Sequence, residues 1–588
     1  MTKRMKTAGP VNRNDDIALK IDSLGSEGQG VGRYEGLAVF VPFALPNEHV
    51  KAHIIKAASN YAVGKLTAVE VPSKDRREPR CSSFTRCGGC NLLHMDYAAQ
   101  LEYKRNVVAN ALMRIGKVAS PHVKRTIGME HPYHYRNKAA FPFAMVDGRM
   151  CFGFFAPRSH RLVPIDGCLI ENRALYNVAQ AVHCWAEEND IAPYDEQTGG
   201  GTLRHVVGRI TTTGDIMAVI VTKGQPKKLN ALENMLTERC EGLKSIILNR
   251  NDEATNVILG DKYETLWGDD TLTEELCGFK FEISAASFLQ VNPIQTEKLY
   301  AQVEAFFPER DGFEAMDVYC GAGTISMVIS KHASHVTGIE NVPSAVEDAR
   351  RNAAMNGVTN ADFICADAAA ALPELIAKGA RPGVIVLDPP RKGCDKAVLD
   401  AVAASGAERI VYVSCDPATL ARDVSILTQS GYSLQSAQPV DMFPQTAHVE
   451  TVVLLSKGEI DSKKVRVEFS LENMDMSGFQ KGATYPQIKE YVREHSGLKV
   501  SSLYISQVKR KCGLDVGQNY NLSKKENVKQ PQCPPEKELA IREALLAPGT
   551  HSHFESGKFS QFWPEPGTNP AQWVRLKTPF RVHPKQPN

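Results

Sequence analysis

Strand-like and helix-like segments alternate along residues 286–457, and this alternation constrains the fold more than any other feature of the sequence. A first apolar run, AMDVY, is followed by the glycine turn CGAG and a helix-like segment, and the runs HVTGIE, ADFIC, VIVLD and VYVSC repeat the rhythm. Chains that alternate in this way form a parallel sheet with helices on its faces. Ligands of such sheets bind at the carboxyl ends of the strands, so the residues that end each run are the first candidates for a site.

Acidic residues and glycines occupy several of these strand ends. Asp317 ends the first strand, and Gly321 and Gly323 let the backbone pass close to a ligand at the start of the next helix. Glu340 ends the second strand, where a carboxylate can accept both hydroxyls of a ribose, and Asp367 follows the third, where it can meet an adenine amino group. A GxG turn also occurs in dinucleotide enzymes, but the third glycine of their GxGxxG spacing is missing. The pattern therefore favours S-adenosylmethionine over a nicotinamide cofactor.

The fourth and fifth strands end in residues suited to chemistry on a planar base. The fourth ends in the motif DPPR, beginning at Asp388, whose rigid prolines and carboxylate can position a flat ring; a tight loop capped by Asp388 is the alternative. The fifth, VYVSCDP, places Cys415 at a strand end, because the proline two positions later cannot continue a ladder. Cys415 is a candidate nucleophile, the alternative being a small buried hydrophobic residue. A helix that starts beyond Asp416 should lower the pKa of its thiol.

A uracil ring is a substrate that would use both a thiolate and a base. Its C5 is a poor nucleophile towards a methyl sulfonium, but addition of a thiolate to C6 makes C5 enolate-like. After methyl transfer, a base must remove the C5 proton before the thiolate can leave. Glu450, at the start of a further strand in DMFPQTAHVETV, can serve as that base if it faces the same cleft as Cys415; a solvated strand-end glutamate is the alternative.

The N-terminal part of the chain has the pattern of a small barrel. Short alternating strands in residues 17–75 are separated by glycine-rich turns, which is typical of barrels that bind oligonucleotides, although a plain accessory barrel fits equally. We therefore expect a barrel domain at 13–75, a central β-rich domain at 76–285 and the alternating domain at 286–457. A helical segment at about 93–118 can pack on the last of these.

The remaining sequence predicts a C-terminal extension and a cytoplasmic location. Residues 458–548 contain two amphipathic helix patterns, YPQIKEYVREHSGL and SSLYISQVKRKCGL, and predict an α-rich extension; residues 549–588 lack periodicity and predict an irregular tail. The polar N-terminus and the absence of a run of 18 apolar residues predict a cytoplasmic protein with no membrane partner. A net charge of +2 neither supports nor excludes a nucleic-acid partner.

Four cysteines in the central part have the spacing of a ligand set. Cys81, Cys87 and Cys90 form a Cys-x5-Cys-x2-Cys run, and Cys168 in VPIDGCLI is a fourth candidate. In a reducing compartment such cysteines are thiols or ligands rather than disulfides. Zinc ribbons usually supply two paired Cys-x2-Cys knuckles, which this set lacks. The spacing favours a [4Fe–4S] cluster, with zinc and unligated cysteines as the alternatives.

Five motifs together resemble those of the S-adenosylmethionine-dependent RNA uracil-C5 methyltransferases: SFLQVNPIQTEKLY, DVYCGAGT, LDPPRKG, VSCDPATLARD and MFPQTAHVETVVLL. The resemblance extends over roughly residues 13–457. It implies that Cys415 is the nucleophile and Glu450 the proton acceptor. It also implies a class I, Rossmann-like methyltransferase domain with a seven-stranded sheet whose last strand is antiparallel. The methyl-donor contacts that it implies are Gln290, Tyr319, Glu340 and Asp388 and, less directly, Asn292 and Asp367.

The resemblance also bears on the RNA substrate. The ribosomal-RNA branch of the family carries an iron–sulfur cluster behind an N-terminal, OB-like TRAM barrel, as residues 17–75 and the cysteines suggest here, whereas the transfer-RNA branch generally lacks both. We therefore expect a multidomain α/β enzyme that methylates C5 of a uridine in 23S ribosomal RNA, with a transfer-RNA uridine as the alternative. The segments HPYHYRNKAAF and APRSHRL interleave basic and aromatic side chains, which suits an RNA partner rather than DNA. A fully ligated cluster would have a structural or RNA-docking role.

Two other classes of protein fit less well. A radical or redox enzyme needs an open cluster iron, typically from a Cys-x3-Cys-x2-Cys run, which the spacing of these cysteines does not match. A non-catalytic RNA-binding protein would have no use for either Cys415 or Glu450.

Overall fold

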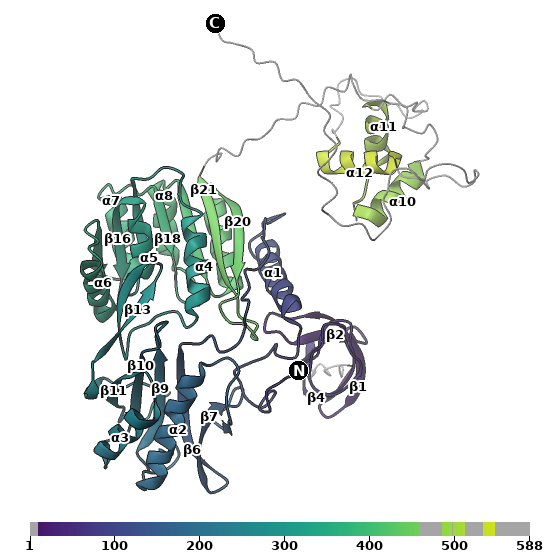
Figure 1. Cartoon of the computed structure of the whole chain (residues 1–588). Helices are drawn as coiled ribbons and strands as arrows, with labels where there is room; N and C mark the ends of the chain where they lie inside the picture. The colour runs from purple at the N-terminus through teal and green to yellow at the C-terminus, as the bar shows by residue number, and fades with distance from the viewer. Residues whose placement is uncertain (1–9, 458–484, 497, 512–532, 547–588) are drawn as a thin grey trace, which may run out of the picture. The chain divides into compact units, whose positions relative to one another are not determined.

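The chain divides into two compact units, Met1–Ser462 and Lys463–Asn588 (Figure 1). No helix in the described part of the chain is long and apolar enough to cross a membrane. The computed structural model describes residues 10–457, 485–496, 498–511 and 533–546.

A closed five-stranded barrel begins the first unit, with the strand order β1-β2-β3-β5-β4. Side chains of β4 alternate between the interior and the surface, as a half-buried strand requires. A Cβ atom at Gly32 would meet the carbonyl oxygen of Lys20 at 2.2 Å, so this glycine allows two strands to approach closely. The expected N-terminal barrel is confirmed. Its strands are β1 (Asp16–Leu24), β2 (Gly30–Tyr34), β3 (Leu37–Val41), β4 (His49–Ala57) and β5 (Tyr61–Val71).

A seven-stranded sheet forms the centre of the unit, in the order β12-β11-β10-β9-β6-β7-β8. The apolar residues of α2 recur every three or four positions, and Leu175, Val182 and Trp185 are completely buried against the sheet. The sequence analysis anticipated strands here but neither α2 nor α3. The elements are β6 (Lys138–Val146), β7 (Arg149–Phe155), β8 (Leu162–Pro164), α2 (Arg173–Glu188), β9 (Leu203–Ile210), β10 (Ile216–Thr222), α3 (Leu229–Arg239), β11 (Leu243–Arg250) and β12 (Lys262–Gly268), followed by the hairpin β13 (Thr271–Leu276) and β14 (Phe279–Ser284).

The third sheet has the seven strands expected of a methyltransferase domain, in the order β17-β16-β15-β18-β19-β21-β20. Neighbouring strands from β17 to β19 are parallel, whereas β21 is antiparallel to both β19 and β20. The prediction of a seven-stranded sheet with a reversed last strand is therefore confirmed. The strands are β15 (Phe313–Val318), β16 (Ala333–Glu340), β17 (Ala361–Cys365), β18 (Val384–Leu387), β19 (Arg409–Ser414), β20 (Tyr432–Val440) and β21 (Glu450–Lys457).

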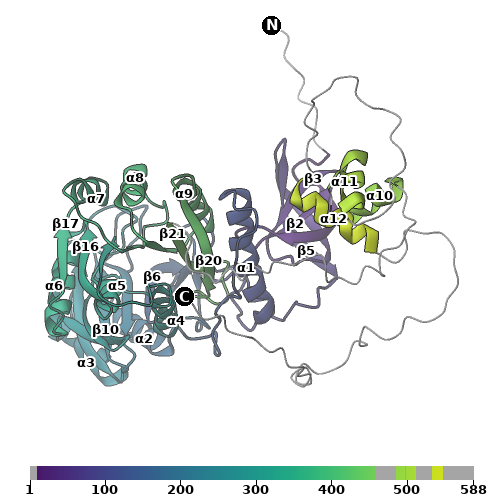
Figure 2. The ribbon, with the colours of Figure 1, turned by 90° about the horizontal axis from the view of Figure 1, so that it is seen from above.

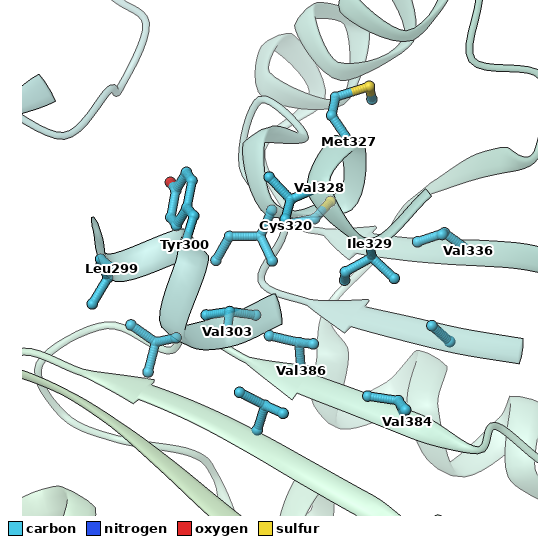
Figure 3. Close-up of a cluster of buried hydrophobic side chains, with 14 of the residues drawn as sticks. Leu299, Tyr300, Val303, Cys320, Met327, Val328, Ile329, Val336, Val384 and Val386 are labelled. Carbon is cyan, nitrogen blue, oxygen red and sulfur yellow. The ribbon is translucent and has the colours of Figure 1, made fainter. Parts of the chain in front are cut away.

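Helices cover both faces of this sheet (Figures 1 and 2). On one face α4, α5 and α6 enclose a core that contains Leu299, Val328 and Val386, part of which Figure 3 shows. On the other face α7, α8 and α9 enclose a second core around Leu399 and Tyr412. The helices are α4 (Pro293–Glu304), α5 (Thr324–Ser330), α6 (Pro343–Met355), α7 (Ala368–Ala377), α8 (Lys396–Ser405) and α9 (Pro417–Gln429).

Helix α1 (Tyr97–Arg114) joins the second of these cores although it is distant in sequence. Val108 and Leu112 are completely buried, and α1 lies against α9 and β20 (Figure 2). The chain between the barrel and the central sheet thus contributes a helix to the methyltransferase domain.

The second unit contains α10 (Tyr485–Ser496), α11 (Ser502–Lys511) and α12 (Pro535–Leu546). Ile488, Val492, Ile505 and Ile541 form its core. The two helix patterns noted in the sequence correspond to α10 and α11, whereas α12 was not anticipated. The predicted tail at 549–588 lies outside the described residues.

Candidate active site

A cavity of about 900 Å³ lies at the carboxyl ends of the parallel strands of the third sheet. Its place follows from the topology, because the chain runs outward from β15 to β16 on one side and to β18 on the other. All but one of the residues predicted for catalysis and methyl-donor binding line it. These are Gln290, Tyr319, Glu340, Asp367, Asp388, Cys415 and Glu450.

The turn between β15 and α5 forms one wall of the cavity. Tyr319 has a left-handed φ of 73°, a conformation that is strained for a residue other than glycine and is often found at functional sites. The carboxylate of Glu340 accepts hydrogen bonds from the amides of Gly321 at 3.1 Å and Val342 at 2.9 Å. These bonds fix the carboxylate at the end of β16 where it lines the cavity.

Two aspartates at this end of the sheet have raised pKa values, the buried Asp317 of β15 and the partly buried Asp388 after β18. Burial, together with the neighbouring Asp317, raises the pKa of Asp388 to about 7. Burial likewise raises the pKa of Asp317 to about 7, although the hydroxyl of Ser326 donates to its carboxylate at 2.5 Å. Asp388 lines the cavity, whereas Asp317 lies beneath it. The Oδ1 atom of Asp317 has no hydrogen-bond partner among the described residues.

Cys415 and Glu450 face each other across two adjacent strands. Ser414 pairs with Thr451 in the antiparallel register of β19 and β21, so the next position on each strand places Cys415 opposite Glu450. Both side chains line the cavity. The sheet therefore brings together the two residues that the sequence analysis assigned to nucleophile and base.

The acidity of Cys415 differs from the sequence expectation. Burial, and then the carboxyl group of Glu450, raise the pKa of the thiol to about 11, with a smaller raising effect from Asp388; Arg391 opposes them. The pKa of this thiol is therefore raised overall, whereas the sequence analysis expected the start of α9 to lower it. A carboxylate caps that helix end, because Asp416 accepts hydrogen bonds from the amides at 418 and 419.

Glu450 is buried and also favours its neutral form. Burial and, to a smaller extent, the neighbouring Asp388 raise its pKa to about 8, although Arg391 opposes the shift. A carboxyl group with a pKa near the working pH is suited to general acid–base catalysis. The cavity thus presents a half-buried thiol and a tuned carboxyl group to one space.

A second cavity, of about 600 Å³, gathers the four cysteines that the sequence analysis singled out. Cys81, Cys87, Cys90 and Cys168 all line it. Burial raises the pKa of Cys168 to about 12 and that of Cys90 further, and the other three thiols add to the shift at Cys90. In the described part of the chain no three histidine, cysteine or acidic side chains are arranged to hold a single metal ion.

Comparison with known proteins identifies the family. The model of the tRNA (uracil-5-)-methyltransferase family matches residues 96–458, which is more than half of the chain. The chain belongs to the RNA uracil-5-methyltransferases. A TRAM-domain model matches residues 10–67, which contain most of the barrel. The enzyme therefore uses S-adenosylmethionine to methylate uracil C5 in an RNA.

Relatives and solved structures agree with this family. RNA methyltransferases of Clostridium acetobutylicum and Halalkalibacterium halodurans are each 44% identical to the chain, over 77% and 76% of its length and 99% of theirs. The crystal structure of the Pyrococcus abyssi tRNA (uracil-54, C5)-methyltransferase with S-adenosyl-L-homocysteine is 26% identical, with a TM-score of 0.61. That match covers 75% of this chain and 100% of the archaeal one.

Asn292 is the one predicted site residue of this methyltransferase that does not line the active-site cavity. It is completely buried, caps α4 by accepting a hydrogen bond from the amide of Gln295, and donates to the carbonyl of Met442 at 3.0 Å. Its place is structural. The sequence analysis missed Phe288 and Phe443, which line the cavity; Phe288 is 74% exposed. The sequence signal for Phe288 is its position two residues before Gln290, a predicted methyl-donor contact.

The basic and aromatic segments proposed for RNA contact are partly buried in this methyltransferase. The ring of Tyr135 is buried, and its hydroxyl donates to the carbonyl of Pro444 at 3.0 Å. Arg136 pairs with the buried Glu171 at 3.4 Å. Arg158 is exposed and pairs with the exposed Glu27 at 3.4 Å. The alternating basic and aromatic residues of these segments therefore include buried side chains as well as exposed ones.

Proposed function

We propose that this RNA uracil-5-methyltransferase acts on a uridine of 23S ribosomal RNA. The observation that carries the proposal is the presence in one chain of a TRAM barrel and a cavity lined by four thiols. The family resemblance assigns these two features together to the ribosomal-RNA branch. We further propose the domain limits 13–75, 76–285 and 286–457, with α1 packed on the last domain.

Cys415 and Glu450 carry the chemistry in this proposal. The thiolate of Cys415 attacks C6 of the uracil and forms a carbon–sulfur bond, which places electron density on C5. Bound S-adenosylmethionine supplies an electrophilic methyl group. Glu450 then removes the C5 proton, the C5–C6 double bond re-forms, and the bond between C6 and Cys415 breaks. The opposed positions on β19 and β21 support these roles.

The residues that line the wall of the cavity fit a nucleoside-bearing methyl donor. Glu340 and Asp367 offer acceptors for ribose hydroxyls and an adenine amino group. Gln290, Tyr319 and Asp388 lie closer to the expected methyl group in this assignment. The positive φ of Gly321, with nothing within 4 Å of a Cβ at that position, supports close passage of a ligand.

The four cysteines fit a [4Fe–4S] cluster better than a single ion. A cubane cluster binds each thiolate to a different iron, so its ligands surround a cavity instead of meeting at one point. The thiols of Cys81, Cys87, Cys90 and Cys168 line such a cavity, and the described residues contain no single-ion arrangement. A cluster with these four thiolate ligands would connect residues 81–90 rigidly to the segment that contains Cys168.

A transfer-RNA uridine is the second candidate substrate. The observation that favours it is the structural similarity to the archaeal tRNA (uracil-54, C5)-methyltransferase over the whole length of that protein.

The experiment that separates the two substrates is transfer of labelled methyl groups to unmodified 23S and transfer RNA, followed by mass mapping. Methyluridine in 23S fragments would support the proposal and locate the site. Label in transfer RNA alone would replace it by the second candidate while retaining the role of Cys415. Label in neither RNA would contradict both.

A further inference from the structure

A loop that joins β20 to β21 carries part of the active site. This base loop, residues 441–449, leads directly into Glu450, and its Phe443 and His448 line the active-site cavity. Gln445 within it has a left-handed φ of 68°. A strained loop keeps such a conformation only when its surroundings hold it in place.

Helix α1 supplies one set of these holding contacts. The completely buried Lys104 pairs with Asp441 and also donates to the carbonyl of Phe443 at 3.0 Å. The side chain of Gln100 accepts a hydrogen bond from the amide of Gln445 at 3.1 Å and donates to its side-chain oxygen at 3.0 Å.

Asn91 supplies a second set, and it also contacts the barrel. Its side-chain oxygen accepts a hydrogen bond from the amide of Ala447 at 2.8 Å, and its backbone amide donates to the carbonyl of Gln445 at 3.2 Å. Its side-chain nitrogen donates to the carbonyl of Glu27, in the turn after β1, at 2.9 Å. One side chain thus bonds both the barrel and the loop that precedes the catalytic base.

The cysteine cavity adjoins the base loop at two points. Cys90 is covalently adjacent to Asn91. Tyr135, whose hydroxyl donates to the carbonyl of Pro444, belongs to a small buried cluster against which Cys90 and Cys168 pack. The two cysteines are thus connected to residues 444–447 by packing against Tyr135, by the peptide bond to Asn91, and by the hydrogen bonds of these two residues.

We propose that the four-cysteine cavity positions the catalytic base, acting on the base loop through Asn91 and Tyr135. These two are positioning residues, and the proposal rests on the function proposed above for Glu450. Its consequence is specific: disturbing the cavity slows the step in which the C5 proton is removed, and leaves the earlier attack and methyl transfer in place.

The first test compares tyrosine variants that each lose one hydroxyl. Tyr135→Phe removes the bond to Pro444, and Tyr432→Phe removes a bond of 2.9 Å to the carbonyl of Ala407 at the opposite end of β20. In single turnover with RNA and S-adenosylmethionine, we expect Tyr135→Phe to lengthen the life of the denaturant-stable protein–RNA adduct roughly tenfold, since one hydrogen bond is worth about that factor. The rate of methyl transfer should change less than about twofold, and Tyr432→Phe should behave as wild type.

The second test uses asparagine variants. Asn91→Ala loses both side-chain bonds, whereas Asn91→Asp retains an acceptor for Ala447 and loses the donor to Glu27. We expect the adduct to persist in Asn91→Ala and to be released near the normal rate in Asn91→Asp. Asn360→Ala is the matched control, because it loses two side-chain bonds to carbonyls far from the cavity.

The third test measures the loop without turnover. Cys168→Ser should raise amide hydrogen exchange in residues 441–449 while exchange in β18 stays unchanged. Unchanged exchange in the loop would overturn the proposal, as would normal adduct release in both Tyr135→Phe and Asn91→Ala. Glu450→Gln separates the proposed role of Glu450 from the positioning role of the cysteine cavity. If this variant fails to trap an adduct, the role of Glu450 is wrong. If it traps an adduct and the positioning variants do not, only the positioning role is wrong.

Discussion

At the residue scale, both groups that must ionise in the proposed reaction favour their neutral form. The pKa of Cys415 is raised to about 11 and that of Glu450 to about 8, chiefly by burial. The carboxyl group of Glu450 also disfavours ionisation of the Cys415 thiol. A cationic methyl donor beside them would favour both anions, so the site is suited to become reactive only when it is loaded.

Replacement of Cys415 tests the nucleophile. Cys415→Ala should abolish methyl transfer, because the other cysteine that lines the cavity, Cys320, is buried in the turn between β15 and α5. Binding of S-adenosylmethionine, measured by calorimetry, should stay within about threefold. Cys365→Ala changes an exposed cysteine outside the cavity and should retain activity. Persistent turnover in Cys415→Ala would remove this residue from the mechanism.

Replacement of Glu450 tests the base and its pH dependence. Glu450→Gln should trap the protein–RNA adduct and slow product release at least about 100-fold, as loss of a general base does. The group acts only when deprotonated, and its pKa is about 8, so release by the wild-type enzyme should accelerate as pH rises from 6 to 9. Release by the variant should lose this dependence. A wild-type profile already flat above pH 6 would contradict the assignment.

The sequence alone could single out the two residues proposed to react, but not their surroundings. Cys415 and Glu450 stand at strand ends that a reader of the sequence can locate. The pKa of Cys415 could not be inferred, because it depends on burial and on Glu450, which is remote in sequence. The burial of Asn292 away from the cavity could not be inferred for a similar reason, because its bond to Met442 exists only in the folded chain.

At the element scale, the parallel sheet was predictable and the covering helices were less so. Short apolar runs with ligand-type residues at their ends define β15–β19 in the sequence. Helix α2 carried an equally clear period in its apolar residues but lay among strand patterns that dominated the interpretation. The packing of α1 on the core beneath α7, α8 and α9 cannot be inferred from the sequence of α1 itself, because it depends on contacts with α9 and β20.

The pair formed by Lys104 of α1 and Asp441 should be important for stability. Both side chains are completely buried, so Lys104→Ala leaves an uncompensated carboxylate and should cost about 3–5 kcal/mol in the free energy of unfolding. Urea denaturation measures this loss. Lys396→Ala breaks an exposed pair with Asp400 and should cost less than about 1 kcal/mol. Equal losses in the free energy of unfolding would show that the buried pair contributes no more to stability than the exposed pair.

At the scale of the whole molecule, the cysteine cavity predicts a metal content. Purified protein should contain about four irons per chain if a [4Fe–4S] cluster is present. Cys87→Ala should lose the iron and its visible absorbance, because one of four ligands is missing. Cys184→Ala lies outside the cavity and is the control. An unchanged iron content in Cys87→Ala would refute the cluster assignment.

The second unit should be dispensable for the chemistry. The family model ends at residue 458, and the clostridial relative matches 77% of this chain but 99% of its own length. A chain that stops after Ser462 should therefore transfer methyl groups to a short RNA within about threefold of the full rate. A much larger loss would assign the helices α10–α12 a part in the reaction.

The reversed strand β21 also has a consequence for synthesis of the protein. It is the last strand to be made, yet it inserts between β19 and β20. Until β21 is made, its place beside β19 is empty, and Cys415, one residue beyond β19, has no Glu450 opposite it. The sheet cannot be completed by adding strands at an edge, so Glu450, the proposed base, takes its place only when β21 inserts between β19 and β20.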